Sequence, residues 1–512
     1  MADPVVVSSA AVWLLPALLV LPVVGALVVW ALPAAQAAAR PIALGTLLVV
    51  AVLASSLWWA VPDAGVRGVV LDLPWIPEWG TRFRLAATGL SLPMLLLSAW
   101  LMPLALLAVG PGRDAERPSA FHAQVLLLTA GILGIFLAGD LLVFYLAWEL
   151  MLVPLYFLVG AWGTARGPRA AKTFFIYTLV GSLLMLVAIL FVVRHTGTTV
   201  IADVIESRRA RPMSVEAQLW CFGAFAAAFL IKSALVPFHT WLPDAQGEAP
   251  AVAATALGIK VGTYGLLAIA YPLFPAAALH PTVRLVLMAL GVAAILHGSL
   301  VALAQPDFRR TMSYASVAHL GFVVVGIAAF TAESVQGAIL VMLNAGITTG
   351  AMFVLLGVLR DRLGAGDAFA ALGGLARAMP LLGTLLVLFV LANVGLPGTN
   401  GFVGEFLVLL GAYKPYPWLV ILATTGVILA AAALLLATQR TLFGPRPADA
   451  PVLRDLGARE ALVLGTFAVA ILALGLAPAP MLARITPAAT ALMESVEAGR
   501  VDPLALEPLG VR

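Results

Sequence analysis

The sequence predicts an all-α polytopic membrane protein with about fourteen transmembrane helices, including two inverted five-helix repeats. Of the 512 residues, 62% are hydrophobic and 11% are charged, whereas a soluble protein carries roughly 25% charged residues. Mean hydropathy is +1.06. The apolar runs are long enough for helices that cross a bilayer, and they lack the alternation of barrel strands. Single charged groups inside these runs are a further indication, because charge at membrane depth is costly and usually serves ion movement.

Composition excludes several classes of function. The formal net charge of +4 is spread over the chain without a basic stripe, so nucleic acid is not an expected partner. Cys221 is the single cysteine, which excludes a disulfide framework, an iron–sulfur site and a zinc ribbon. The six histidines do not pair at haem or metal spacing. We therefore expect no cofactor or metal in this chain.

The spans can be placed from the apolar runs. Residues 5–32 are interpreted as a permanent first span, because no Lys or Arg precedes them and a cleavable signal has a positively charged start. Loop 63–84 is rich in Pro, Trp and Gly and predicts an external cap or hairpin. The predicted spans lie near 11–32, 42–62, 85–109, 119–138, 141–161, 173–193, 216–236, 250–274, 282–304, 312–331, 335–359, 381–410, 417–438 and 460–478.

Loop charges predict the orientation of the helices. The odd-numbered loops carry 15 Lys and Arg residues, and the opposite side carries 12. Because positive loops stay in the cytoplasm, we expect the odd loops to be cytoplasmic and both termini to be external. Arg309 and Arg310 precede the tenth span and are expected to anchor it at the cytoplasmic surface.

Two predicted spans contain Pro and Gly breaks, which give discontinuous helices near 232–243 and 393–405. Pro237 and Pro397 are 160 residues apart. Matching breaks in two halves are typical of transporters built from repeats, and repeats of five spans must be inverted. The alternative is that Pro and Gly are simply common in membrane helices. We predict an N-terminal three-helix segment (1–118, with external loop 63–84), a first repeat (119–275), a second repeat (282–440) and a C-terminal helix and tail (441–512).

Glu149 and Lys232 are lone charges in the fifth and seventh spans. A buried glutamate is either neutral or paired with a cation, and Lys232 is the natural partner. If the two approach each other, movement of the lysine changes the proton affinity of the carboxylate. The alternative is a static ion pair that holds helices together.

Three further groups complete a candidate proton relay. Lys260 lies near mid-depth of the eighth span, where a buried lysine can release a proton, although snorkelling to an interface is the alternative. His319 suits a proton wire but could equally be a satisfied core histidine. Glu405 follows the second break, so its carboxylate should face a cavity unless it caps a helix. His239 and His297 are weaker candidates of the same kind.

Five stretches of sequence carry a family resemblance. They are LLVFYLAWELMLVPLYFLVGAWG, FLIKSALVPFHTWLPDAQGEAP, KVGTYGLL, RRTMSYASVAHLGF and LPGTNGFVGEF, between residues 140 and 406. Together they resemble the antiporter-like M subunit (chain 4 in mitochondria) of bacterial NADH:quinone oxidoreductase, respiratory complex I. Glutamate at position 405, where other members of the superfamily have lysine, is typical of the M type.

The resemblance implies that the chain is a proton-translocating membrane subunit of complex I, driven by redox chemistry in other subunits. It implies that Glu149 pairs with Lys232, that Lys260 is the central station, that His319 is a connector and that Glu405 is the terminal group. It also implies that NADH, FMN, iron–sulfur and quinone chemistry belongs to partner subunits. The chain would lie in the bacterial inner membrane beside L-type and N-type antiporter-like neighbours.

Four positions depart from the family pattern. The segment from Pro250 to Lys260 is three residues shorter than usual, which would turn a regular helix by about 300° and re-aim Lys260. Ala345 replaces a frequent histidine and is expected to remove a stepping stone between His319 and Glu405. Thr88 replaces a frequent aspartate, and Gln246 a frequent histidine.

Two alternative functions remain open on the sequence. One is a subunit of an Mrp-type cation/proton antiporter, a membrane hydrogenase-like complex or an inorganic-carbon-uptake complex. The other is a largely structural membrane subunit that has lost conduction, which would agree with Ala345 and the shortened eighth span.

Overall fold

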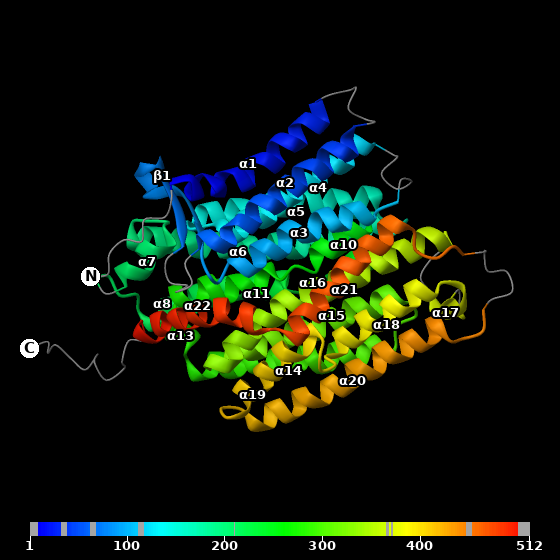
Figure 1. Cartoon of the computed structure of the whole chain (residues 1–512). Coiled ribbons are helices and arrows are strands. Elements are labelled where there is room, and N and C mark those ends of the chain that lie inside the picture. Colours follow the sequence, from blue (N-terminus) through cyan, green and yellow to red (C-terminus); the bar gives the residue numbers. More distant parts are fainter. Residues whose placement is uncertain are drawn as a thin grey trace, which may run out of the picture.

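The computed structural model describes residues 9–31, 38–61, 68–110, 117–208, 210–364, 368–369, 372–446 and 453–499. Long helices run side by side along most of the molecule (Figure 1). Twelve helices in the described part of the chain are long and apolar enough to cross a membrane. With the shorter apolar helix α3 (Leu92–Ala108) and the broken pair α18–α19 (Pro380–Val394 and Asn400–Tyr413) each counted as one crossing, the predicted fourteen crossings are confirmed.

The N-terminal part holds three long helices and a small sheet. The helices are α1 (Ser9–Ala31), α2 (Ala39–Ala60) and α3. Strands β1 (Val69–Ile76) and β2 (Thr81–Ala87) form an antiparallel hairpin, as predicted for loop 63–84, of which residues 63–67 lie outside the described residues. The third span was predicted from residue 85, which is wrong, because Leu85 and Ala87 pair with β1 before the helix begins.

The order of the following helices matches the two predicted repeats. Each group has its broken helix in fourth position, and five crossings separate equivalent helices, so the groups run in opposite directions through the membrane. The first group comprises α4 (Pro118–Leu137), α5 (Leu141–Trp162), α6 (Gly167–Thr196), α8 (Val215–Lys232) with α9 (Trp241–Glu248), and α10 (Ala251–Leu257) with α11 (Val261–Gly265), the π-helical segment Leu266–Ala270 and α12 (Tyr271–Leu273). The second comprises α14 (Pro281–Leu303), α15 (Phe308–Ala329), α16 (Ala332–Leu363), α18–α19 and α20 (Pro417–Leu442).

Helix ends are fixed by local side-chain chemistry. Asp140 caps α5, accepting hydrogen bonds from the backbone of Leu142 and Val143. Its carboxylate is fully buried and also bonds the Thr199 hydroxyl. Burial raises the pKa of Asp140 above its ordinary value, against the opposing effect of these hydrogen bonds. The Asp140 cap therefore ties the start of α5 to the α6–α7 connection, where α7 spans Ile201–Ser207.

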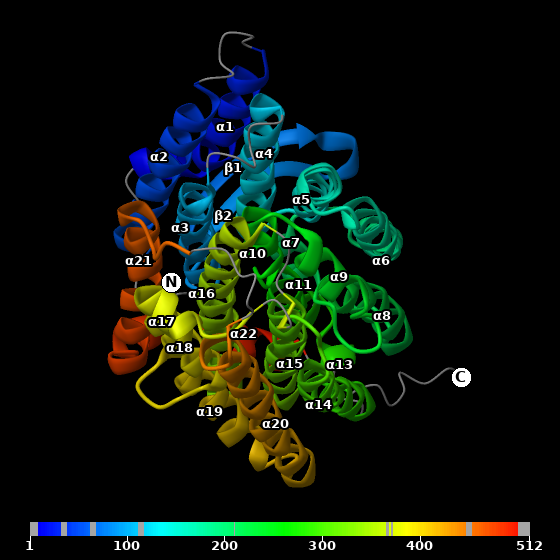
Figure 2. The same cartoon turned by 90° about the vertical axis from the view of Figure 1, so that its right-hand side faces the viewer.

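Helix α16 lies near the middle of the bundle when the helices are viewed nearly end on (Figure 2). Every residue in its most apolar stretch is buried, whereas only 28% of that stretch is buried in α20. The polar side chains of α15 and α16 therefore face protein instead of lipid. The bundle interior can hold ionisable groups without exposing them to acyl chains.

The C-terminal part ends differently from the prediction. Helix α21 (Ala458–Leu476) is the expected last span, but residues assigned to the tail form another helix, α22 (Ala479–Ala498). Arg484 of α22 donates to the Val61 carbonyl at 2.9 Å and stands over the Trp58 ring at the end of α2. The short helices α13 (Pro275–Ala278) and α17 (Leu375–Ala378), and a 3-10 turn between the two strands (Pro77–Trp79), complete the described elements.

Candidate functional site

Four of the five predicted relay residues are buried inside the bundle. Lys232, Lys260, His319 and Glu405 are only 7%, 3%, 7% and 8% exposed. Glu149 is partly exposed, with its Oε1 atom buried. Snorkelling of Lys260 to a lipid interface is therefore wrong.

Lys232 is the last residue of α8, and its ammonium stands among aromatic rings. Nζ lies 5.0 Å from the centre of the Phe174 ring and 5.6 Å from that of Trp148. Nζ and the Oε1 of Glu149 both lack a hydrogen-bond partner in the described part of the chain. Glu149 nevertheless acts on Lys232 through its charge. The two groups are electrostatic neighbours, and no hydrogen bond joins them.

The chain turns sharply after Lys232, as the prolines predicted. Trp241 at the start of α9 donates its indole N–H at 2.9 Å to the Ile231 carbonyl, which also accepts from the backbone N–H of Ala234. The Ser233 hydroxyl is buried without a partner among the described residues. The break therefore leaves a buried hydroxyl group directly after Lys232 in the chain, where a regular helix would continue.

Lys260 lies in a third helix break, between α10 and α11, which was not predicted from the sequence. It is the N-cap of α11, with φ −87° and ψ 51°, so residues 250–274 are not one regular helix. The expected rotation of about 300° assumed such a helix. Because of this break, the direction of the Lys260 side chain does not follow from the rotation of α10. The shorter segment therefore does not turn this side chain out of the protein.

A close approach holds α11 against α8. A Cβ atom at Gly262 would lie 2.4 Å from the Phe229 carbonyl oxygen, and at Gly265 it would lie 2.6 Å from the Phe229 ring. Only glycine fits such spacing, because a side chain would force backbone apart. These two glycines place Lys260 next to the helix that ends in Lys232.

His319 and Glu405 are in direct contact. Nδ1 of His319 and Oε1 of Glu405 are joined by a hydrogen bond of 3.0 Å between α15 and α19. The expected gap at Ala345 is therefore wrong: the residues that the missing histidine would connect already touch. Glu405 does not serve as the helix cap, because Thr399 is the N-cap of α19.

Small polar side chains of α15, α16 and α19 contact one another inside the bundle, and the sequence alone did not single them out. Ser316, one turn before His319, lies 3.3 Å from the Thr349 hydroxyl of α16. The Thr349 side chain in turn approaches Gly258 at the third break. Asn344 donates to the Asn400 carbonyl at the start of α19. Hydroxyl and amide residues inside apolar runs were the available signal, but only packing shows which of them meet.

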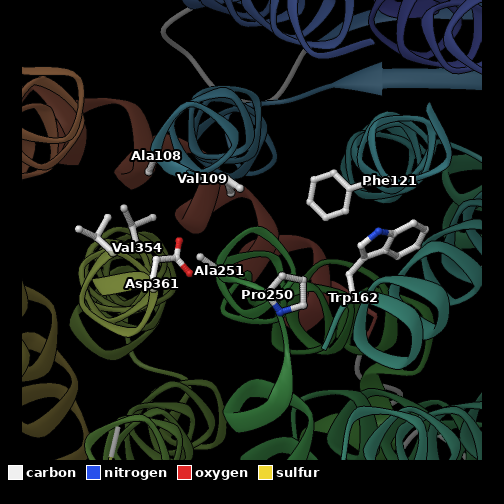
Figure 3. A pocket seen from close by; sticks show the side chains of 10 residues that line it. Ala108, Val109, Phe121, Trp162, Pro250, Ala251, Val354 and Asp361 are labelled. Atoms are coloured by element: carbon white, nitrogen blue, oxygen red, sulfur yellow. The ribbon is translucent and has the colours of Figure 1, made fainter. Parts of the chain in front are cut away.

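A small pocket opens where several helices end on one side of the bundle (Figure 3). The Asp361 carboxylate near the end of α16 points into it, beside Pro250 and Ala251 at the start of α10. Phe121 and Trp162 lie across the pocket, with ring centres 5.5 Å apart. This pocket is at the loop end of the segment that carries Lys260.

Comparison with known proteins agrees with this geometry. Residues 138–430 match the family described as NADH:quinone oxidoreductase/Mrp antiporter, TM. The chain is 37% identical to NADH-quinone oxidoreductase subunit M of Pseudomonas aeruginosa over 92% of this chain and 95% of that protein. The structure of respiratory complex I from Thermus thermophilus contains a chain that is 33% identical with a TM-score of 0.85, covering 94% of this chain and 99% of the other.

The structure of the Mrp complex from Dietzia contains a more distant chain, 21% identical with a TM-score of 0.83, covering 96% of this chain and 100% of the other. At that identity the likeness shows the fold alone. The match to subunit M, in contrast, extends along nearly the whole of both chains. The protein therefore belongs to the antiporter-like transmembrane family of NADH:quinone oxidoreductases and Mrp antiporters, and within it to the M subunits of complex I.

Proposed function

We propose that this chain moves protons across the membrane through Glu149, Lys232, Lys260, His319 and Glu405, driven by redox chemistry in partner subunits. The main support is Lys232, whose buried ammonium lies near Glu149 without a fixed partner. An uncompensated charge in a low-dielectric interior is expensive, so small movements of this lysine have large electrostatic consequences.

The proton steps follow from the charges. When Lys232 stays near Glu149, the ammonium compensates an ionised carboxylate. When it moves toward Lys260, the carboxylate loses this compensation and binds a proton. The added positive charge favours proton release from Lys260 toward the Ser316 and Thr349 hydroxyls. His319 then accepts the proton and passes it to Glu405, with which it already shares a hydrogen bond.

The relatives are named as subunits of NADH-quinone oxidoreductase, which supports a place for this chain in a larger membrane complex. We infer that NADH, FMN, the iron–sulfur clusters and quinone are bound by partner subunits, and that L-type and N-type antiporter-like subunits are the membrane neighbours. The chain would lie in the bacterial inner membrane with its odd-numbered loops in the cytoplasm and both termini outside. Residues 119–275 and 282–440 would be the two half-units of the route, between the N-terminal segment 1–118 and the C-terminal segment 441–512.

The experiment that tests the function uses Lys232→Ala and Glu149→Ala in the assembled complex, reconstituted into vesicles. NADH-driven proton uptake should fall by about tenfold or more, as expected when a proton-transfer group is removed. Lys172→Ala changes an exposed lysine at the start of α6 and should leave uptake unchanged. Unchanged pumping in both test variants would favour the purely structural role instead.

A further inference from the structure

Two histidines outside the proposed relay form a contact that links the two halves of the chain. His239 follows the first break and is 8% exposed, and His297 lies on α14. Their Nε2 atoms are 3.0 Å apart, with ring centres separated by 4.6 Å and planes inclined at 72°. At that distance one imidazole donates its N–H and the other accepts, so the pair shares a proton.

The pair lies between a charged surface and the interior. His297 is six residues before the end of α14, which corresponds to about 9 Å of helix at 1.5 Å per residue. Tyr314, six residues into the following helix α15, has its ring centre 6.2 Å from that of His239. The charges of Asp244 and Arg310 act on Tyr314, so the phenol lies between the histidines and these ions.

The charged side chains at this end of the helices form a compact cluster around Arg310. Arg310 lies 3.2 Å from Asp244, 3.5 Å from Glu248 and 3.7 Å from Asp307. Asp244 is half exposed, at 50% of its side chain, so the cluster meets the aqueous phase. Arg309, in contrast, is buried and donates to the Gln246 and Ala249 carbonyls, so only one of the two arginines can be the expected surface anchor.

The second ring nitrogen of His239 is not used in the contact with His297. Its Nδ1 is buried and makes no hydrogen bond of ordinary geometry with the described residues. The backbone of Pro237, within the same break, acts on the ring. Lys232 lies seven residues earlier, at the other end of this break. An imidazole with one nitrogen bonded to His297 and the other buried beside the backbone of the break can transfer a proton through its ring.

We propose that His239 and His297 carry protons between the surface cluster of Asp244, Glu248, Asp307 and Arg310 and the interior near Lys232. A proton binds Nδ1 of His297, and the proton on its Nε2 passes to Nε2 of His239. His239 then releases the proton from its Nδ1 toward the break. Each ring gains one N–H bond and loses another, so no oxidation or leaving group is involved. This step rests on the proposed proton translocation and would supply it from the loop side.

The first test is His297→Ala in the assembled complex in vesicles, with NADH-driven proton uptake measured alone, with added imidazole and with added pyrrole. The two compounds are of similar size, but only imidazole can accept and release a proton between two nitrogens. Uptake should fall by about tenfold, and imidazole should restore it while pyrrole does not. Equal restoration by both compounds would show that the ring only fills space, and this would overturn the proposal.

A second variant separates proton transfer from hydrogen bonding. His297→Gln can keep a hydrogen bond to His239 but cannot pass a proton through the side chain, so uptake should remain slow. Uptake at the unmodified rate in this variant would exclude the transfer step. His195→Ala, which removes a surface histidine stacked on Phe191, is the matched control and should have no effect.

The variants also distinguish this step from the proposed function. If Lys232→Ala slows uptake while both His297 variants do not, the relay stands and only the histidine step fails. If Lys232→Ala has no effect, proton translocation by this chain fails first. Quinone reduction by detergent-solubilised complexes measures assembly independently of proton uptake.

Discussion

Single ionisable residues could be identified from the sequence because they lie inside apolar runs. Glu149, Lys232 and Lys260 interrupt apolar runs, where an ionised side chain is energetically costly and usually serves a function. Their identity as buried groups was therefore predictable. The contact between His319 and Glu405 was not, because it joins residues 86 positions apart and depends on how α15 meets α19.

At this residue scale, we expect His319→Ala and Glu405→Ala to act on one shared step. Each change alone should slow NADH-driven proton uptake by about tenfold, and the two together should slow it hardly further, because groups in direct contact are not additive. Proton uptake by vesicles of the assembled complex provides the measurement. Glu216→Gln, at an exposed position on α8, is the control, and additive losses in the double variant would contradict a shared step.

Broken helices are the elements that give the site its chemistry. A regular helix bonds its own carbonyls and leaves no acceptors for a ligand or proton carrier. The breaks near Pro237 and Pro397 were predictable because proline cannot continue a helix. The break at Lys260 was not, since its segment GIKVG contains no proline and is held open by the approach of α11 to α8.

At the element scale, Gly395→Ala should damage the second break. Gly395 ends α18 with φ +77°, and a Cβ there would lie 2.9 Å from Oε2 of Glu405. A left-handed alanine costs about 1–2 kcal/mol, and the new methyl group should displace the carboxylate from His319. We expect a lower thermal unfolding midpoint together with reduced proton uptake.

The matched control for this change is Gly465→Ala. Gly465 lies inside α21, and a Cβ there would have no neighbour within 4 Å. Alanine in a helix interior is favoured over glycine by about 1 kcal/mol, so stability should stay equal or rise. A Gly395→Ala protein that matched this control in stability and uptake would show that Glu405 does not depend on the break.

The packing of the whole molecule keeps the proposed proton route away from lipid. Helix α16 is surrounded by protein along its most apolar stretch, while α6 and α20 turn much of their surface outward. This arrangement keeps ionisable side chains away from lipid and close to one another. On the proposed route, the two buried lysines favour protons over other ions, because a buried ammonium repels other cations unless it loses its proton.

At the scale of the whole molecule, we therefore expect pumping to be independent of sodium. Replacement of all Na⁺ by K⁺ should leave NADH-driven acidification of the vesicle interior unchanged in rate and extent. A pH-sensitive dye inside the vesicles measures it, with a protonophore as the control that abolishes the signal. Acidification that appears only when Na⁺ is present would contradict direct proton transfer through these lysines.

The sequence by itself determined that this is a helical membrane protein with about fourteen crossings, paired breaks and a small set of buried charges. These properties follow from composition, run length and proline, each of which acts locally along the chain. Tertiary structure alone decided that His319 meets Glu405, that Lys260 sits in a break of its own, that α22 packs on the bundle, and that His239 meets His297. Such contacts join distant residues through packing between helices, and no local pattern in the chain encodes which helix faces will meet.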